Sequence, residues 1–262
     1  MIKFNHHSQF GYDTFPDLHP VDGQPFVNTY QDNSCIDQTD GIAFLFEPRS
    51  MIGPAYDYVE NNADKFDLIF THDSRILKNN NAFFFSWANV WITTDSEKTK
   101  GISLVSSWKD WCELHKARLE LARLFKDSDK VDVFGTFDDP YKSPEFVAAP
   151  ADYLEHYKFS IIIENDIDEL WFTEKILNCF STKTVPIYVG ATKIGEVFDG
   201  RGIIQVDDWK DIPDIVDRLD IDSYASYLPY IEENFERVNK YKTPWDKRFF
   251  DTYTDVIEGM YG

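Results

Sequence analysis

The chain has 262 residues, 43% of them hydrophobic, and its 26 Lys and Arg face 46 Asp and Glu, for a formal net charge of −20. This length and apolar content suit one large or two modest folded domains and exclude a disordered chain. The negative charge argues against nucleic acid or an anionic membrane as a partner, because both would repel the protein. An anionic ligand would need a few locally placed cations.

Two further features of the sequence limit the class of protein. The three cysteines, Cys35, Cys112 and Cys179, are scattered and form no CxxC pair, so they indicate neither a zinc site nor a disulfide framework. The first residues, "MIKFNHHSQFGYD", lack the apolar core of a signal peptide, and no run reaches the roughly 18 apolar residues of a membrane span. We therefore expect a soluble cytoplasmic protein without stable membrane insertion.

Short apolar runs alternate with helical patterns along the chain. The runs are typical of buried strands in a mainly parallel sheet, and in chain order they cover 41–46, 66–71, 131–135, 159–164, 185–190 and 202–206. Helical patterns lie between them, at 56–62, 111–125 and 174–183. This alternation predicts an α/β fold.

The polar stretch 93–101, "TTDSEKTKG", is the best candidate for a domain boundary. We expect an N-terminal α/β lobe over 1–100 and a second α/β lobe over 101–240. A C-terminal helix over 241–262 could return to the first lobe. Because ligands of open α/β sheets lie beyond the carboxyl ends of the strands, the residues that follow each strand matter most.

Glu47 is the first candidate for chemistry. In "GIAFLFEPRS" a buried strand runs into this carboxylate and then into a proline that ends the strand. An acid at a strand end could serve as a general base if partial burial raises its pKa. The alternative is a solvated loop glutamate that pairs with Arg49.

Arg118 is the second candidate. One face of the expected helix is apolar, and Arg118 is predicted at the edge of this face, which contains Leu114, Ala117, Leu121, Leu124 and Phe125. An arginine beside a core needs an anionic partner, and a guanidinium can bind a diphosphate through two hydrogen bonds. The alternative, which an acidic chain favours, is an ion pair with an Asp or Glu of the protein.

The third candidate site follows the run 159–164. Glu164 and Asn165 come at the carboxyl end of a predicted strand, and Thr173 is a good N-cap for the next helix. Glu174 suits the positive end of the helix dipole, whereas Lys175 does not. Either Lys175 is solvated or an anion at the helix start offsets the cost, as in a phosphate site. In the second case, Lys175→Ala is expected to weaken ligand binding and leave the fold intact.

The stretch "FSIIIENDIDELWFTEKILNCFSTKTVPIYVGA", 159–191, closely resembles the signature of the α-1,3-fucosyltransferase family, glycosyltransferase family ten. The segment "GIIQVDDWKDIPDIVDRL" is similar to the part of the family that follows it, and "FDLIFTHDSRIL" and "HKARLELARLF" are similar to parts upstream. The resemblance covers roughly 41–250 and is strongest over 159–210.

The resemblance implies a GT-B fold, with two facing Rossmann-like lobes built on mainly parallel sheets. In such a fold the lobe over 1–100 would lie on the acceptor side, and the lobe over 101–240 would bind the nucleotide sugar. It also implies an inverting glycosyltransferase of glycan biosynthesis that moves fucose, or a related sugar, from a GDP-sugar to a hydroxyl of an oligosaccharide or glycolipid. No metal and no further cofactor are required in this family.

The family motif also implies roles for particular residues. Arg118 and Lys175 match the cations that contact the diphosphate, and Glu174 matches the carboxylate that binds the ribose. Asn165 matches an asparagine near the phosphates, and Glu47 matches the proposed base. Two positions depart from the motif. Trp171 stands where the family has a nucleotide-contacting tyrosine, and Ile163 replaces the phenylalanine before the Glu-Asn pair.

Two other functions stay open at this point. Asp166 and Asp168 have the DxD spacing of metal-dependent GT-A-type glycosyltransferases, although Asp220 and Asp222 repeat that spacing in this acidic chain. The second is a non-catalytic sugar-nucleotide or glycan-binding protein, because the resemblance is thin before residue 100.

Overall fold

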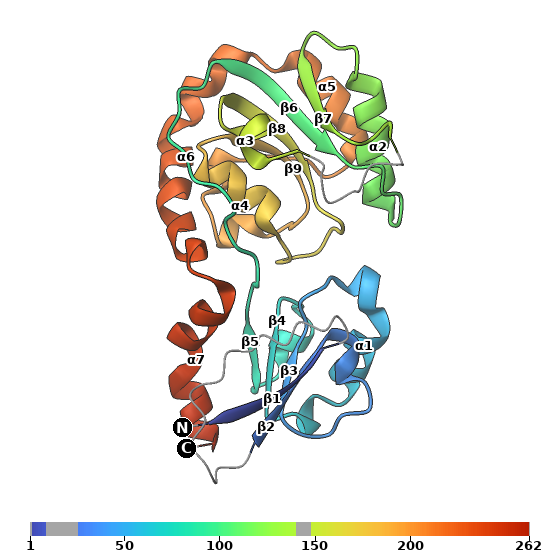
Figure 1. The fold of residues 1–262 in the computed structure, drawn as a ribbon, viewed down its shortest axis with the longest axis vertical. Helices are drawn as coiled ribbons and strands as arrows, with labels where there is room; N and C mark the ends of the chain where they lie inside the picture. Colours follow the sequence, from blue (N-terminus) through green and yellow to red (C-terminus); the bar gives the residue numbers. More distant parts are fainter. Residues whose placement is uncertain (1, 9–25, 140–147, 262) are drawn as a thin grey trace. The chain divides into compact units, whose positions relative to one another are not determined.

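The computed structural model describes residues 2–8, 26–139 and 148–261. The chain forms two compact units (Figure 1). Unit 1 comprises Met1–Trp87, Asp168–Trp171 and Thr243–Gly262, and unit 2 comprises Ala88–Ile167 and Phe172–Lys242. Each unit contains a five-stranded sheet in which every pair of neighbouring strands is parallel, so the predicted α/β class is confirmed.

The sheet of unit 1 has its strands in sequence order: β1 (Lys3–Ser8), β2 (Phe26–Gln31), β3 (Ile42–Phe44), β4 (Leu68–Thr71) and β5 (Ala82–Phe84). Helix α1 (Arg49–Asn61) packs with Ala43 and Ile69 of the sheet, whereas α7 (Trp245–Tyr261) packs with Phe44 and Phe70. Successive strand residues point to opposite faces, so the two helices cover opposite faces of the sheet. Short 3-10 helices complete unit 1, at Asp32–Cys35, Ala63–Lys65 and Ile76–Lys78.

The sheet of unit 2 has the strand order β10-β9-β8-β6-β7. Its strands are β6 (Lys100–Ser106), β7 (Val131–Gly135), β8 (Tyr157–Ile163), β9 (Val185–Val189) and β10 (Ile204–Gln205). The chain runs outward from β6 to β7 and then returns to place β8 on the other side of β6. This reversal makes a topological switch point between β6 and β8, where the carboxyl ends of parallel strands open a crevice for ligands.

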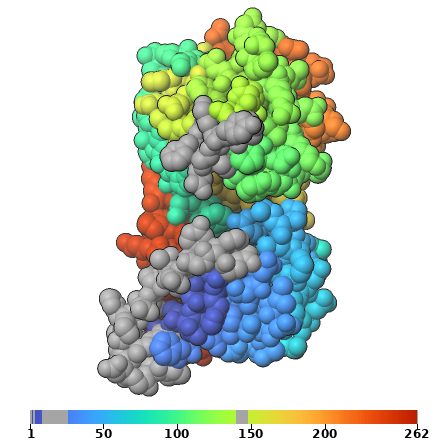
Figure 2. Space-filling model, turned by 45° about the vertical axis from the view of Figure 1, so that its right-hand side comes forward, coloured from blue at the N-terminus to red at the C-terminus, as the bar shows by residue number. Residues whose placement is uncertain are grey.

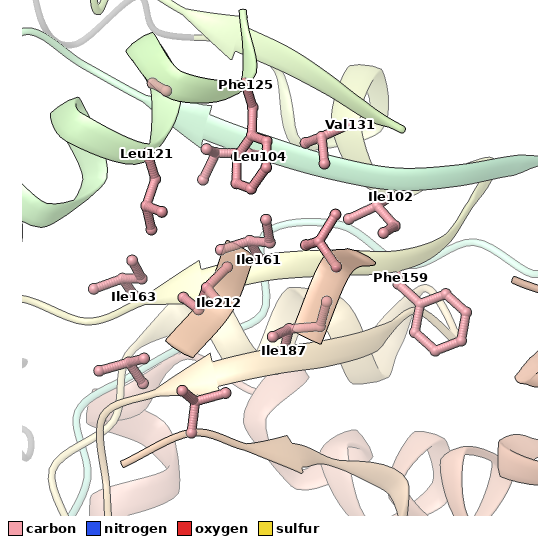
Figure 3. Packing of buried hydrophobic residues seen from close by; sticks show 14 of the residues in the cluster. Ile102, Leu104, Leu121, Phe125, Val131, Phe159, Ile161, Ile163, Ile187 and Ile212 are labelled. Carbon is pink, nitrogen blue, oxygen red and sulfur yellow. The ribbon is translucent and has the colours of Figure 1, made fainter. Parts of the chain in front are cut away.

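Helices cover both faces of this second sheet. On one face, α2 (Glu113–Phe125) and α5 (Ile212–Arg218) pack on the isoleucines and valines of the strands (Figure 3). On the other face, Ser103 donates a hydrogen bond to the carbonyl of Tyr153 in α3 (Pro150–Leu154). Helix α4 (Glu174–Ser181) follows β8, and α6 (Tyr224–Arg237) contacts α4. The 3-10 helices of unit 2 are Ile194–Glu196, Gly200–Gly202, Trp209–Asp211, Ile221–Ser223 and Val238–Lys242.

Each of the six predicted strands has a counterpart in the structure, namely β3, β4, β7, β8, β9 and β10. The predicted helices correspond to α1, α2 and α4, and α1 begins seven residues before its prediction. Strands β1, β2, β5 and β6 were not predicted. Strand β6, "KGISLVS", alternates apolar residues with serines, so its apolar run is interrupted.

Candidate active site at the switch point of unit 2

A cavity of about 370 Å³ lies in unit 2 at the carboxyl ends of β6 and β8. Its walls include Ser106 and Ser107 at the end of β6, Asn165 just after β8, and Pro150 and Tyr153 of α3. This is the crevice that the switch in strand order creates. The volume is in the range of sites for small molecules and cofactors.

The cavity is positively charged, although the chain as a whole is strongly negative. Among the residues that the structure describes, three cations line it, Lys109, Arg118 and Lys175, together with one carboxylate, that of Glu174. These residues come from the β6–α2 loop, from α2 and from the start of α4. A local excess of cations is what an anionic ligand of this protein would require.

Arg118 has no carboxylate of its own among the residues that the structure describes. Its Nη2 donates to Oδ1 of Asn165 at 2.6 Å, and its Nε lies 3.4 Å from the carbonyl oxygen of Leu114. Burial lowers the pKa of the guanidinium, and the more distant Glu164 opposes this shift. The alternative of an ion pair between Arg118 and an Asp or Glu is therefore wrong for the residues that the structure describes. The N–H donors that Asn165 and Leu114 do not use remain for a ligand.

The buried face of α2 differs from the prediction. It contains Leu114, His115, Ala117, Leu119, Leu121, Ala122 and Phe125. At about 100° per residue, this arc is centred on Arg118. Leu124, which was predicted to belong to the apolar face, is 59% exposed, and Figure 2 shows this part of the chain, in bright green, at the surface of unit 2. Arg118 thus extends from the middle of the buried face to the cavity, which the periodicity of leucines did not indicate.

Lys175 is paired inside the protein. Thr173 caps α4 as predicted, because its Oγ1 accepts from the backbone N–H of Lys175. The Nζ of Lys175 donates to Oε2 of Glu164 at 3.0 Å and to Oγ1 of Thr173 at 3.0 Å, and it lies 3.8 Å from Glu174. Burial lowers the pKa of Lys175, but Glu164 and Glu174 outweigh it, so the pKa is raised. Lys175, whose side chain is 22% exposed, therefore has carboxylate partners within the protein and does not depend on a ligand for its only counter-charge.

Glu164 holds the start of α4 against the end of β8. Its carboxylate is fully buried and accepts from the backbone N–H of Thr173 at 2.9 Å, from Thr173 Oγ1 at 2.7 Å and from Lys175 Nζ. A buried carboxylate with these three donors fixes the turn between a strand and a helix. The sequence signal was present, since an acid directly follows a buried run, but no role was assigned to it.

Gly190, just after β9, lies against this carboxylate. A Cβ at this position would be 2.5 Å from the hydroxyl oxygen of Tyr188 and 2.7 Å from Cγ of Glu164. We expect Gly190→Ala to lower the free energy of unfolding by about 1–3 kcal/mol, the usual range for overpacking. Gly195→Ala is the matched control, because a Cβ at Gly195 would meet no neighbouring atom within 4 Å. Equal denaturation midpoints for the two variants would show that the surroundings of Glu164 adapt.

Glu47 and Trp171, the two remaining predicted site residues, lie in unit 1. Glu47 follows β3 and is partly exposed. Trp171 is only 2% exposed, is absent from the cavity walls of unit 2, and donates from Nε1 to the carbonyl oxygen of Phe46 at 3.0 Å. The same carbonyl accepts from Nε1 of Trp87 at 3.0 Å. Trp171 thus holds the residue that precedes Glu47.

Asp32 also fixes this loop, and sequence reasoning missed it. Its buried carboxylate accepts from the backbone N–H of Phe46 at 2.8 Å and of Glu47 at 3.2 Å, while its own φ is 54°. Burial raises the pKa of Asp32, and these hydrogen bonds oppose the shift. On the other side, the hydroxyl of Tyr56 donates to the carbonyl oxygen of Glu47 at 2.7 Å. The backbone of Glu47 is therefore held from both sides.

Both carboxylates of the DxD pair have partners within the protein. Oδ1 of Asp166 accepts from the backbone N–H of Ile167 at 2.9 Å. Oδ1 of Asp168 accepts from the backbone N–H of Leu170 at 3.2 Å and lies 3.6 Å from Nδ1 of His72. Over 2–8, 26–139 and 148–261, no group of three or more His, Cys, Asp or Glu is arranged to hold a metal ion. Nor do these residues include a helix long and apolar enough for a membrane span.

A family model matches residues 95–254, that of "Glycosyltransferase family 10 (fucosyltransferase) C-term". A bovine 3-galactosyl-N-acetylglucosaminide 4-alpha-L-fucosyltransferase is 29% identical over 160 residues, which are 56% of this chain and 41% of the relative. An alpha-(1,3)-fucosyltransferase of Helicobacter pylori is 30% identical over 77 residues, 29% of this chain and 15% of the relative. The chain thus matches less than half the length of these curated relatives.

Solved structures extend the likeness to both sheets. A crystal structure of an alpha1,3-fucosyltransferase with GDP covers 89% of this chain and 81% of its own, with a TM-score of 0.54 and 14% identity. One with GDP-fucose covers 89% and 77%, with a TM-score of 0.55 and 13% identity. At this identity the likeness concerns the fold, which agrees with the predicted GT-B class.

Proposed function

Because the chain belongs to glycosyltransferase family 10, the fucosyltransferase family, we propose that it is an inverting glycosyltransferase. In this proposal it transfers fucose, or a related sugar, from a GDP-sugar to a glycan hydroxyl. The observation that carries the proposal is the cavity at the switch point of unit 2, where Arg118 has no carboxylate partner in the described chain and lies with Lys175 and Glu174 on the same walls. This charge pattern fits a nucleoside diphosphate.

The leaving diphosphate would be stabilised by groups that are already in place. Arg118 offers the donors that Asn165 and Leu114 leave unused, and the N-terminus of α4 offers backbone N–H groups and the positive end of its dipole. Lys175 has three N–H donors, of which Glu164 and Thr173 take two. Preorganised donors of this kind favour the transition state, in which negative charge builds up on the leaving group.

Glu174 and Trp171 take different parts in this proposal. The carboxylate of Glu174 lines the cavity and would accept hydrogen bonds from the ribose hydroxyls. Trp171 is buried in unit 1 and donates to the carbonyl oxygen of Phe46. We therefore assign Trp171 to positioning the Glu47 loop, instead of the nucleotide contact that the family motif implied.

Glu47 is the proposed general base, and Glu47→Gln tests this role. The amide cannot accept the acceptor's proton, so we expect transfer from GDP-fucose to fall by about 10²–10⁴-fold, the usual contribution of a general base. GDP affinity should stay unchanged, because the cavity lies in unit 2. Asp64→Asn, which also removes one negative charge from an exposed position of unit 1, is the control.

Three results of these assays would change the proposal. Transfer that survives in Glu47→Gln would place the base at another residue. Tight binding of GDP-fucose by the natural protein without a single turnover on a panel of oligosaccharide and glycolipid acceptors would favour the non-catalytic binding protein. A need for a divalent ion in either assay would favour the metal-dependent alternative.

A further inference from the structure

His115 is a buried polar residue of the cavity that the proposed function has not used. It lies on α2, one turn before Arg118, and lines the same cavity. His115 is only 7% exposed. Its Nδ1 is buried and has no hydrogen-bond partner in the part of the chain that the structure describes. Buried polar atoms nearly always have a partner, so an unpaired one in a residue that lines a cavity points to a ligand atom that reaches it when the site is filled.

The charges around His115 explain its protonation state. Burial, together with the cations Arg118, Lys175 and Lys109, lowers the pKa of His115 to about 4. The side chain of Asn165 favours the protonated form but does not offset these effects. The nearby carboxylates Glu164 and Glu174 both lie close to Lys175. At neutral pH the imidazole is therefore uncharged.

We propose that His115 binds a phosphate group of the ligand in this cavity through Nδ1, and that the imidazole takes up one proton from solvent as the anion binds. The proton goes to Nδ1, which then donates a hydrogen bond to a phosphate oxygen, and no other bond is made or broken. The anion would neutralise the cations that keep the free imidazole uncharged. The inference rests on the proposed function, which supplies a diphosphate as the anion.

Proton uptake on binding fixes the direction of the pH dependence. The pKa of His115 is low in the free protein and higher in the complex, so the extra affinity is present at low pH and is lost as the pH rises through the pKa of the complex. If the anion restores the ordinary pKa of about 6.5, affinity rises about tenfold between pH 8 and pH 5.5. Arg118 and Lys175 stay charged throughout this range and do not contribute to the change.

Calorimetry tests this inference with two probes, GDP and inorganic pyrophosphate. Each is titrated near pH 6 in two buffers of different ionisation enthalpy, so that the difference in heat counts the protons taken up. His115→Asn keeps a donor near Nδ1 but does not titrate. His156→Asn, which removes an exposed histidine of unit 2 outside the cavity, is the matched control. Because the phosphates of the probes also titrate, the quantity of interest is the difference from His115→Asn.

We expect the natural protein and His156→Asn to take up more protons than His115→Asn, by up to one per site, and to lose affinity more steeply toward pH 8. Equal uptake in all three proteins would overturn the inference while leaving GDP binding, and hence the proposed function, in place. Should His115→Asn fail to fold, guanosine serves as the reference on the natural protein, because it lacks the anion. Uptake with guanosine equal to that with GDP, or binding of neither GDP nor pyrophosphate, would overturn the inference.

Discussion

Changing Arg118 to methionine lowers the affinity for GDP by at least about 30-fold, because it removes a partly buried cation from a charged contact that is typically worth about 2–5 kcal/mol. The fold should survive this change. Arg118 makes one hydrogen bond to Asn165 and has no carboxylate partner among the described residues, so methionine leaves no buried charge unpaired. Isothermal calorimetry with GDP measures the loss, and a urea titration checks stability.

Arg123→Met is the matched control for this prediction. Arg123 lies on the same helix, but it is exposed and does not line the cavity. The Arg123→Met change removes the same charge from the protein as a whole, so any general electrostatic effect on an anionic ligand appears in both variants. Similar GDP affinities for the two variants would mean that Arg118 does not contact the diphosphate.

Changing Lys175 to alanine destabilises the protein by about 3–5 kcal/mol, the usual cost of removing one partner of a buried ion pair. Glu164 is fully buried, and Lys175 is its partner at 3.0 Å. The sequence-based expectation that this variant keeps its fold intact is therefore revised. A fall in GDP affinity in Lys175→Ala alone would not distinguish a loss of stability from a loss of the contact between Lys175 and GDP.

The double variant Glu164→Gln with Lys175→Ala separates the two effects. Glutamine carries no charge to leave unpaired, so we expect it to recover most of the lost stability while GDP binding stays weak. Lys116→Ala removes an exposed partner of Glu113, where the two side chains are 59% and 88% exposed, and should leave the stability nearly unchanged. If Lys175→Ala unfolds at the same urea concentration as Lys116→Ala, the buried pair does not stabilise the fold.

The sequence predicted best those elements whose pattern is local. Strand β7 has the predicted bounds, 131–135, and β8 and β9 consist mainly of buried apolar residues because helices cover both faces of their sheet. Strand β1, "KFNHHS", is an edge strand with polar residues at most of its positions, and no apolar run marks it. Sequence patterns therefore find strands that carry an apolar run, such as the edge strand β7, more readily than strands of mixed composition, such as β6 inside its sheet.

The site was predicted in part, and its internal partners were not. Arg118, Asn165, Glu174 and Lys175 do line one cavity. The pairing of Lys175 with Glu164 joins a strand end to a helix start eleven positions later, and no local pattern specifies it. The same is true of Trp171, whose four-residue segment Asp168–Trp171 belongs to unit 1 although the chain on both sides belongs to unit 2.

The most direct test of this account is a calorimetric titration of GDP into the natural protein in the presence of EDTA. The account predicts one site per chain, with GDP bound at least about tenfold more tightly than UDP and no loss of affinity on removing divalent ions; tenfold corresponds to about 1.4 kcal/mol. Absence of GDP binding, or equal binding of the two nucleotides, would contradict the claim that the cationic cavity of unit 2 is a site for a GDP-sugar.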